Sequence, residues 1–232
     1  MTPRRVFLGS LVAASASGVA VSSFIPAQLA AQQKPPKVAP ENDAILTEIR
    51  RQLELAGREA QRTPKTGTWQ RGSSALLMFA AWCQTNEIDK QLQAAIRQRG
   101  ATALAYQMTQ FRPEKELKHL GLTLPAPVTA GTLDDYERAI NGILKQGLGP
   151  VLRSQAALLS AAEQRGAGRV GVARIQLTPE QQEGCRRFKE QMLWAEVSWM
   201  LLCIAGPWFC GIVGFQYFLA QIAGYYYWQG LC

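Results

Sequence analysis

Apolar residues recur at every third or fourth position along most of the chain after residue 42, which is the spacing of one buried face of an α-helix. Asn42 or Asp43 can cap the first such segment. Its apolar face is formed by Ile45, Ile49, Leu53 and Ala56. The next segment, 74–83, is almost continuously apolar and too short to span a bilayer, so we expect a central core helix there. The pattern weakens over 101–110, and Pro113, Pro125 and Pro127 bracket a stretch where we expect a short helix followed by a loop.

Helix start signals predict further helices downstream. Thr132 and Asp135 have the spacing of a capping box. Pro150 and Pro179 stand where the first turn of a helix accepts proline. Only 169–177 has strand-like character, and one short strand cannot make a sheet. The chain is therefore expected to be all-α, an irregular bundle of about six or seven helices with no internal repeat.

The last part of the chain differs from the rest because the 32 residues of 197–228 carry no charged side chain. Gly206-Pro207 interrupts this run and indicates two helices, which would form a very apolar C-terminal helix or hairpin. The second of them, 208–228, would be about 31 Å long, enough to span a bilayer. It has aromatic residues at both ends, as a carboxy-terminal membrane anchor would.

Charge placement opposes the membrane interpretation. A basic cluster at 186–189 would lie outside the membrane, and no lysine or arginine follows Trp228 to hold the tail inside. In the alternative, 197–232 is a buried hairpin covered by the amphipathic helices before it. We lean toward contact with membrane lipid or a membrane complex, because so long an uncharged segment would need most of the domain to cover it.

The first 31 residues have the three parts of an export signal: a basic start, an apolar middle over 6–25 and a small-residue exit ending in Ala30-Ala31. The segment resembles the twin-arginine export signal through Thr2, Arg4, Arg5, Phe7 and Leu8. Pro3 and Gly9 depart from that pattern. The resemblance implies that the twin-arginine export machinery carries the folded chain to the periplasm or cell envelope. A general secretory signal is the alternative, and neither says anything about activity.

Composition divides the chain into four parts. They are a signal peptide at 1–31, a Pro- and Lys-containing linker at 32–41, an amphipathic helical domain at 42–196 and an apolar segment rich in cysteine and aromatic residues at 197–232. The signal carries two arginines and no acidic residue, so its removal would lower the formal net charge from +8 to +6. Because the basic residues are scattered along the predicted helices, we expect no nucleic-acid partner.

Five cysteines are an odd number for a protein expected in an oxidising compartment, and four of them fall in the last 48 residues. The disulfide candidates are Cys185, Cys203, Cys210 and Cys232. Cys185 or Cys203 could bond Cys232 across a hairpin. Cys203 and Cys210 would lie about 10 Å apart along a continuous helix, too far to bond each other. Buried, unpaired thiols are the alternative.

The motifs that could indicate a cofactor or a metal site lack the neighbouring elements or residues that such sites need. Residues 166–171 match G-x-G-x-x-G, but a predicted helix, not a strand, precedes them. Glu116 and His119 have the spacing of a di-iron ligand pair, yet His119 is the only histidine, so the site cannot be completed. The wide cysteine spacing also disfavours zinc and iron–sulfur sites. We expect no cofactor and no metal.

Two carboxylates, Glu190 and Glu196, are the best candidates for catalysis, because a glycan-cleaving site needs only two acids. They lie beside Trp194 and Trp199, and burial in the apolar segment would raise the pKa of Glu196. In the alternative, Glu196 lies at the polar edge of an amphipathic helix, paired with a basic residue.

Three functional hypotheses follow. The favoured one is a non-catalytic helical protein of the cell envelope, held at the membrane or in a membrane complex through 197–232. The second is a soluble exported helical binding or interaction module, in which the last helix is core. The third is an exported hydrolase that uses Glu190 and Glu196.

Overall fold

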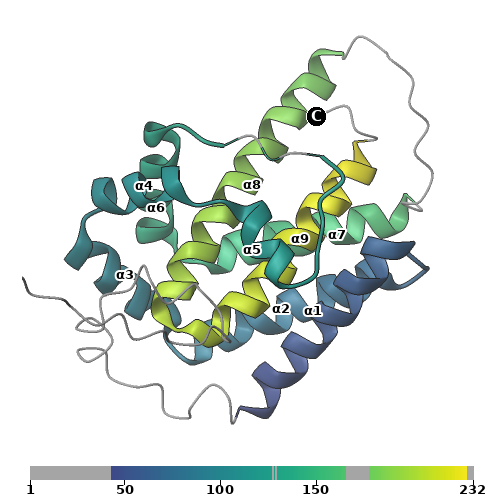
Figure 1. The fold of residues 1–232 in the computed structure, drawn as a ribbon, viewed down its shortest axis with the longest axis horizontal. Helices are drawn as coiled ribbons and strands as arrows, with labels where there is room; N and C mark the ends of the chain where they lie inside the picture. Colours follow the sequence, from purple (N-terminus) through teal and green to yellow (C-terminus); the bar gives the residue numbers. More distant parts are fainter. Residues whose placement is uncertain (1–42, 127, 129, 166–177, 229–232) are drawn as a thin grey trace, which may run out of the picture.

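The computed structural model describes residues 43–126, 128, 130–165 and 178–228 (Figure 1). Within these ranges the chain forms nine α-helices and no strand, which confirms the all-α prediction. The helices are α1 (Ala44–Arg62), α2 (Thr68–Thr85), α3 (Ile88–Arg99), α4 (Ala101–Gln110), α5 (Pro113–His119), α6 (Leu133–Gln146), α7 (Gly149–Gln164), α8 (Pro179–Ala205) and α9 (Pro207–Tyr227). The predicted signal peptide with Arg4, Arg5, Phe7 and Leu8, its linker and 166–177 lie outside the described residues.

The predicted number of helices, six or seven, is too low because several helices are separated by very short breaks. Gly100 alone separates α3 from α4, and its φ of 84° lies in the left-handed region that glycine adopts readily. Asn86 and Glu87 separate α2 from α3. Breaks of this kind barely disturb the apolar periodicity, so a reading of the pattern merges neighbouring helices.

Helix α9 lies in the middle of the bundle, where it packs against α1, α2, α7 and α8 (Figure 1). Its buried side chains include Ile212, Val213, Phe215, Phe218, Leu219 and Ala220. They point in all directions around the helix axis, because consecutive positions are buried. The apolar surface of α9 is therefore covered by helices of the same chain.

The prediction of a very apolar C-terminal helix is wrong. No helix in the described ranges combines the length and the apolar character needed to cross a membrane. The reason lies in the sequence of α9, where Gln216, Gln221 and several glycines and tyrosines interrupt the strongly apolar residues. The C-terminal part instead forms a hairpin of α8 and α9, which pack against each other.

A disulfide joins Cys203 in the last turn of α8 to Cys210 in the first turn of α9. Our expectation that these two residues are too far apart to bond is wrong, because it assumed one continuous helix. The chain turns back at Gly206, and Pro207 begins α9. The turn brings the two cysteine Cα atoms within 4.8 Å of each other.

The other cysteines differ in state. Cys185 is also disulfide-bonded, whereas Cys83 is a buried free thiol whose pKa is raised by burial. Cys232 lies outside the described residues. Disulfides therefore hold Cys185, Cys203 and Cys210, and the alternative of a small buried thiol applies to Cys83.

Helix α6 begins at the predicted capping box. The hydroxyl of Thr132 accepts a hydrogen bond from the Asp135 N–H at 3.2 Å, and the Asp135 carboxylate accepts one from the Thr132 N–H at 3.0 Å. These reciprocal bonds fix the first turn of α6. Tyr136 follows Asp135 directly, so the same turn fixes the direction in which its side chain enters the bundle.

Candidate functional site

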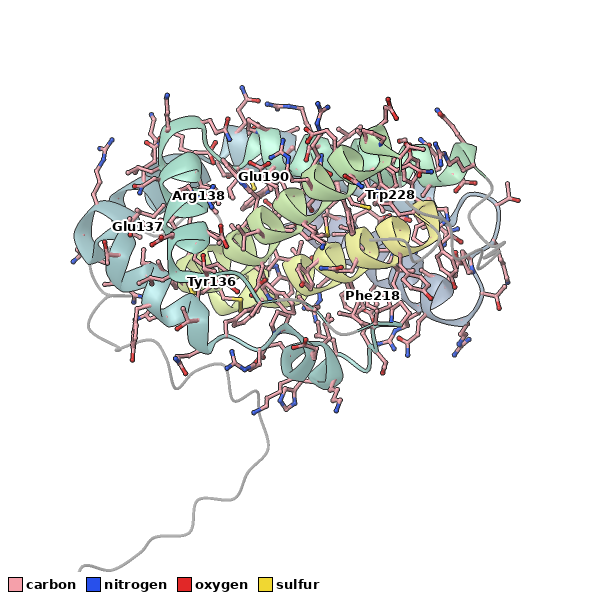
Figure 2. The ribbon with its side chains drawn as sticks, turned by 90° about the horizontal axis from the view of Figure 1, so that it is seen from above. Tyr136, Glu137, Arg138, Glu190, Phe218 and Trp228 are labelled. Atoms are coloured by element: carbon pink, nitrogen blue, oxygen red, sulfur yellow. A yellow bond between two sulfur atoms is a disulfide. The ribbon has the colours of Figure 1, made fainter. Side chains whose placement is uncertain are left out.

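A groove of about 630 Å³ lies between α6, α8 and α9, beside the segment that precedes α6. We call it the α6–α8–α9 groove; Arg138 on α6 and Glu190 on α8 line two of its walls (Figure 2). Its aromatic lining consists of Phe188, Trp194, Tyr217, Tyr225 and Trp228. Its charged lining consists of Asp135, Arg138, Arg186, Lys189, Glu190 and Glu196. An apolar hollow with a few placed polar groups is the usual form of a small-molecule site.

Glu196 lies at the floor of this groove. It is only 3% exposed, and its Oε1 accepts a hydrogen bond of 2.9 Å from the hydroxyl of Tyr136. The Tyr136 oxygen accepts a hydrogen bond of 3.1 Å from the Gly131 N–H. The phenol is therefore held between a backbone donor and the carboxyl group, and it fixes the position of Glu196 Oε1.

Burial raises the pKa of Glu196 to about 7. The nearby carboxylate of Glu114 raises this pKa further, while the hydrogen bond from Tyr136 and the charge of Arg112 lower it. No basic residue of the described part forms an ion pair with Glu196. The predicted rise in pKa is thus present, whereas the alternative of a basic partner on the same helix is not found.

Two buried tyrosines lie close to Glu196: Tyr136, which hydrogen-bonds it, and Tyr217, which lines the groove. Burial and the neighbouring carboxyl of Glu196 raise the pKa of Tyr136 and of Tyr217 well above the ordinary value. The Tyr217 hydroxyl accepts a hydrogen bond of 2.9 Å from the Gln221 side-chain amide. Both phenols therefore stay neutral at any physiological pH, and Glu196 is the group of the floor that titrates near neutrality.

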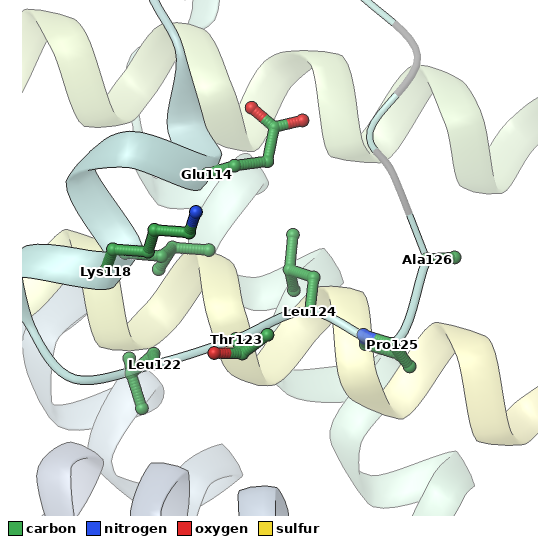
Figure 3. A pocket seen from close by; sticks show the side chains of 8 residues that line it. Glu114, Lys118, Leu122, Thr123, Leu124, Pro125 and Ala126 are labelled. Carbon is green, nitrogen blue, oxygen red and sulfur yellow. The ribbon is translucent and has the colours of Figure 1, made fainter.

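A second, smaller pocket of about 180 Å³ lies beside the groove, on α5 and the segment after it (Figure 3). Leu124, Pro125 and Ala126 line both hollows. Glu114 lines the small pocket and accepts a hydrogen bond of 3.3 Å from the Val128 N–H. Glu114 therefore has two effects: its charge raises the pKa of Glu196, and its hydrogen bond holds the segment after α5 to that helix.

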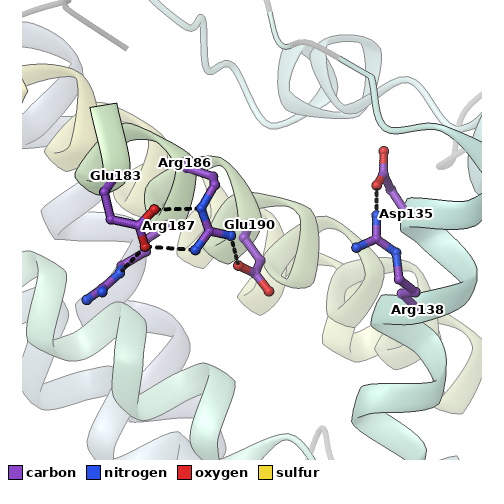
Figure 4. A network of polar contacts seen from close by, with 6 residues as sticks. All are labelled: Asp135, Arg138, Glu183, Arg186, Arg187 and Glu190. Carbon is purple, nitrogen blue, oxygen red and sulfur yellow. Dashed lines mark hydrogen bonds and ion pairs between the residues drawn. The ribbon is translucent and has the colours of Figure 1, made fainter. Parts of the chain in front are cut away.

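The second predicted carboxylate, Glu190, lies at the rim. Its side chain is 56% exposed, and its Oε2 is 3.6 Å from Nη1 of Arg186 (Figure 4). Arg186 also binds Glu183, with 2.7 Å between Nε and Oε2. On the facing helix, Asp135 pairs with Arg138. Exposed pairs such as these contribute little to stability, but they leave the rim nearly neutral.

The two tryptophans expected beside the carboxylates lie in different places. Trp194 lines the groove. Trp199 is buried in the core, with its ring centroid 5.3 Å from those of Phe111 and Tyr217. The structure therefore brings Glu190, Glu196 and Trp194 to one groove and leaves Trp199 out of it. A catalytic role for the carboxylates stays a prediction.

Two helical glycines leave room for aromatic side chains that line the groove. A Cβ atom on Gly142 of α6 would overlap the ring of Trp194. In the same way, a Cβ on Gly224 would overlap Phe188. The missing side chains let rings lie directly on the backbone of the neighbouring helix, which fixes their orientation.

Sequence reasoning missed Tyr136 and Glu114. The apolar periodicity of α6 is enough to place Tyr136 on a buried face, but it cannot show that the hydroxyl meets a carboxyl 60 positions later in the chain. A usable signal existed in the buried phenol itself, because a buried Tyr hydroxyl needs a hydrogen-bond partner. Glu114 gave no signal, since a carboxylate in the first turn of a short helix has an ordinary capping explanation.

Neither a metal cluster nor a relative identifies the chemistry of this groove. Among the residues that the structure describes, no group of three or more His, Cys, Asp or Glu side chains could hold a metal ion. No protein family, curated protein or solved structure matches this chain. Function must therefore be argued from the geometry alone.

Proposed function

We propose that this protein is an exported, non-catalytic binding module of the cell envelope that holds a small amphiphilic molecule in the α6–α8–α9 groove. One observation carries the proposal: aromatic side chains of α8 and α9 line the same hollow of about 630 Å³ as a buried carboxyl group. A hollow of this volume is large enough for a drug-sized ligand. Its mixture of aromatic walls and polar floor suits a molecule with an apolar body and a polar group.

Export and location rest on the first 31 residues, whose resemblance to a twin-arginine signal implies the periplasm or envelope. Of the two interpretations of 197–232, the buried hairpin has more support, because α9 is covered by α1, α2, α7 and α8. A partner such as membrane lipid or a membrane complex would have to meet the surface of the bundle and not a free apolar helix.

A two-carboxylate hydrolase is the second candidate, and the observation in its favour is Glu196. A carboxyl group with a pKa of about 7 suits a general acid. The geometry of its partners argues against this candidate. Glu190 is engaged by Arg186 at the rim, and Glu114 accepts a backbone hydrogen bond in the neighbouring pocket. Each of these carboxylates therefore already has a partner, which disfavours its use as base or nucleophile.

The proposal is tested with the mature protein and Nile red, a neutral dye that fluoresces in apolar sites. We expect saturable binding at one site per chain. Ala130→Trp adds an indole to the wall of the groove at an exposed position and should reduce the affinity at least about tenfold. Ala94→Trp, at an exposed position of α3, is the matched control and should not change it.

Absence of saturable dye binding, or equal binding by both tryptophan variants, would refute the binding module. Turnover of cell-wall glycans by the mature protein, abolished in Glu196→Gln, would establish the hydrolase instead. Cell fractionation with intact-mass measurement tests the rest of the proposal: we expect residues 1–31 to be absent from the protein of the envelope fraction.

A further inference from the structure

Glu196 is a buried carboxyl group to which no described residue supplies a counter-ion. It is 97% buried, and the described part of the chain gives it one hydrogen bond, from the neutral Tyr136 hydroxyl to Oε1. No described residue donates a hydrogen bond to Oε2. An ionised carboxylate in such a place is costly unless a cation or several donors meet it.

Aromatic side chains line the groove that Glu196 also lines. Trp194, Tyr225 and Trp228 line the groove, and no guanidinium or ammonium group of the described residues is stacked on them. Elsewhere in this chain such faces are occupied: the Arg165 guanidinium carbon lies 4.0 Å from the ring centroid of Tyr227. Aromatic rings attract cations through the negative potential of their faces, most strongly where water is excluded.

We propose that the α6–α8–α9 groove binds an organic ammonium ion; this inference rests on the proposed function as a binding module. The ammonium group lies against the Glu196 carboxylate and replaces the missing counter-ion. The apolar part of the molecule lies along the aromatic lining on the Glu196 side of the groove, Trp194 and Tyr225. This combination of one carboxylate and several aromatic faces distinguishes an ammonium from a neutral or anionic molecule of the same shape.

The charges around the site are consistent with this ligand. Glu114 is the other carboxylate close enough to act on Glu196, and it favours a cation as well. The positive charge of Arg112 disfavours a bound cation only weakly, since that side chain is exposed and donates hydrogen bonds to backbone carbonyls. Tyr136 and Tyr217 are neutral. At the rim, Arg138 and Arg186 are paired with acids, which leaves Lys189 as the cation without an ion pair among the described residues.

The ligand should bind more tightly as the pH rises. The ionised form of Glu196 is the form that attracts an ammonium ion, and this carboxyl group has a pKa of about 7 in the free protein. Affinity for a cation should therefore rise between about pH 6 and about pH 8 and then level off. Below neutrality, binding should release a proton from Glu196.

The test uses three probes of one shape that differ in charge: phenethylammonium, phenethyl alcohol and hydrocinnamate. Each is titrated against the mature protein by calorimetry and by displacement of Nile red. At about pH 8 we expect the ammonium to bind at least about tenfold more tightly than the alcohol, and the carboxylate to bind most weakly. In Glu196→Gln, which keeps an acceptor for Tyr136, the ammonium and the alcohol should bind alike. Glu54→Gln, on the exposed face of α1, is the control and should keep the preference.

Each outcome decides between the two proposals. If Nile red binds in the groove but the three probes bind equally, or hydrocinnamate binds best, the ammonium proposal is overturned and the binding module stands. If Nile red does not bind, both fail. If Glu196→Gln does not fold, the pH dependence in the wild-type protein decides: an ammonium preference that does not rise through neutrality overturns the role of Glu196.

Discussion

Two buried polar clusters of the bundle differ in what surrounds them. In the first, the Gln216 side-chain amide donates a hydrogen bond of 2.7 Å to Gln155 Oε1 of α7, and both residues are fully enclosed in the core. In the second, Glu196 accepts from Tyr136 at the floor of the α6–α8–α9 groove. Neither glutamine lines that groove. The first cluster is neutral and closed, whereas the second is ionisable and faces a hollow.

The difference shows why burial of a polar group does not by itself mark a functional site. A neutral pair can satisfy part of its hydrogen bonding internally and serve to fix how two helices align. A carboxyl group without a counter-ion cannot be satisfied in its charged form, so it either stays protonated or needs a cation from outside. Only the second arrangement, next to a hollow, implies a ligand.

The largest effect that separates the two clusters should be the pH dependence of stability. The pKa of Glu196 is about 7 in the folded protein against 4.5 for the model carboxyl group. Because the folded state binds the proton of Glu196 more tightly, the contribution of this group to the free energy of unfolding is largest below about pH 4.5 and falls as the pH rises toward 7. The loss should approach about 3 kcal/mol. Chemical unfolding of Glu196→Gln at several pH values measures it: the variant should be the more stable protein at about pH 8.

The control for this prediction is Gln216→Met, which alters the closed cluster and removes no titratable group. It should shift stability by the same amount at every pH. A Glu196→Gln protein whose stability falls with pH as steeply as that of the wild type would contradict the assignment of the buried carboxyl group.

The second effect concerns the disulfide between Cys203 and Cys210, at the opposite end of α9 from Tyr225. Closing a loop of this length should stabilise the folded state by about 2–3 kcal/mol. The double substitution Cys203→Ala and Cys210→Ala should therefore lower the free energy of unfolding by that amount. It should leave Nile red affinity unchanged, because no groove residue lies in the turn between α8 and α9. A large loss of dye binding would show that the turn and the groove are coupled.

Helix α6 and the turn between α8 and α9 show how much of the fold could be predicted from the sequence. The all-α class and the start of α6 at Thr132 follow from local signals, namely helical periodicity and cap spacing. The disulfide was excluded wrongly because its geometry depends on the angle between two helices, which a linear pattern does not contain. A pattern also cannot choose between a membrane anchor and a core helix, since both need a long apolar segment.

The candidate site was predicted in part. Burial of Glu196 follows from the apolar residues around it in α8. Its partner Tyr136 and the aromatic residues of α9 come together only through tertiary packing. Hydrogen bonds between residues far apart in sequence leave no periodic signal, so the groove could not be assembled before the structure.

The third effect tests the closed cluster directly. Gln155 Nε2 and Gln216 Oε1 are buried without a hydrogen-bond partner, so this pair is only half satisfied. Replacing one glutamine by Met leaves the other amide without its one partner, which should cost about 1–2 kcal/mol. Replacing both should be nearly neutral, because no polar group then remains buried. Urea unfolding of the two single variants and the double variant gives the coupling energy. Additive losses would mean that the two amides do not act as a pair.

The smallest effect compares two helical glycines, one away from the groove and one behind its wall. At Gly211 of α9 a Cβ would meet nothing closer than Arg50 Nε at 3.7 Å, an ordinary contact. Gly211→Ala should therefore raise the free energy of unfolding by about 0.5–1 kcal/mol through helix propensity. At Gly142 a Cβ would overlap the ring of Trp194, so Gly142→Ala should lose about 1 kcal/mol despite the same propensity gain. It should also weaken Nile red binding, since the indole has to move into the groove. If both substitutions stabilise the protein and leave dye binding intact, Trp194 is not held by α6, and the wall of the groove is more adaptable than its packing implies.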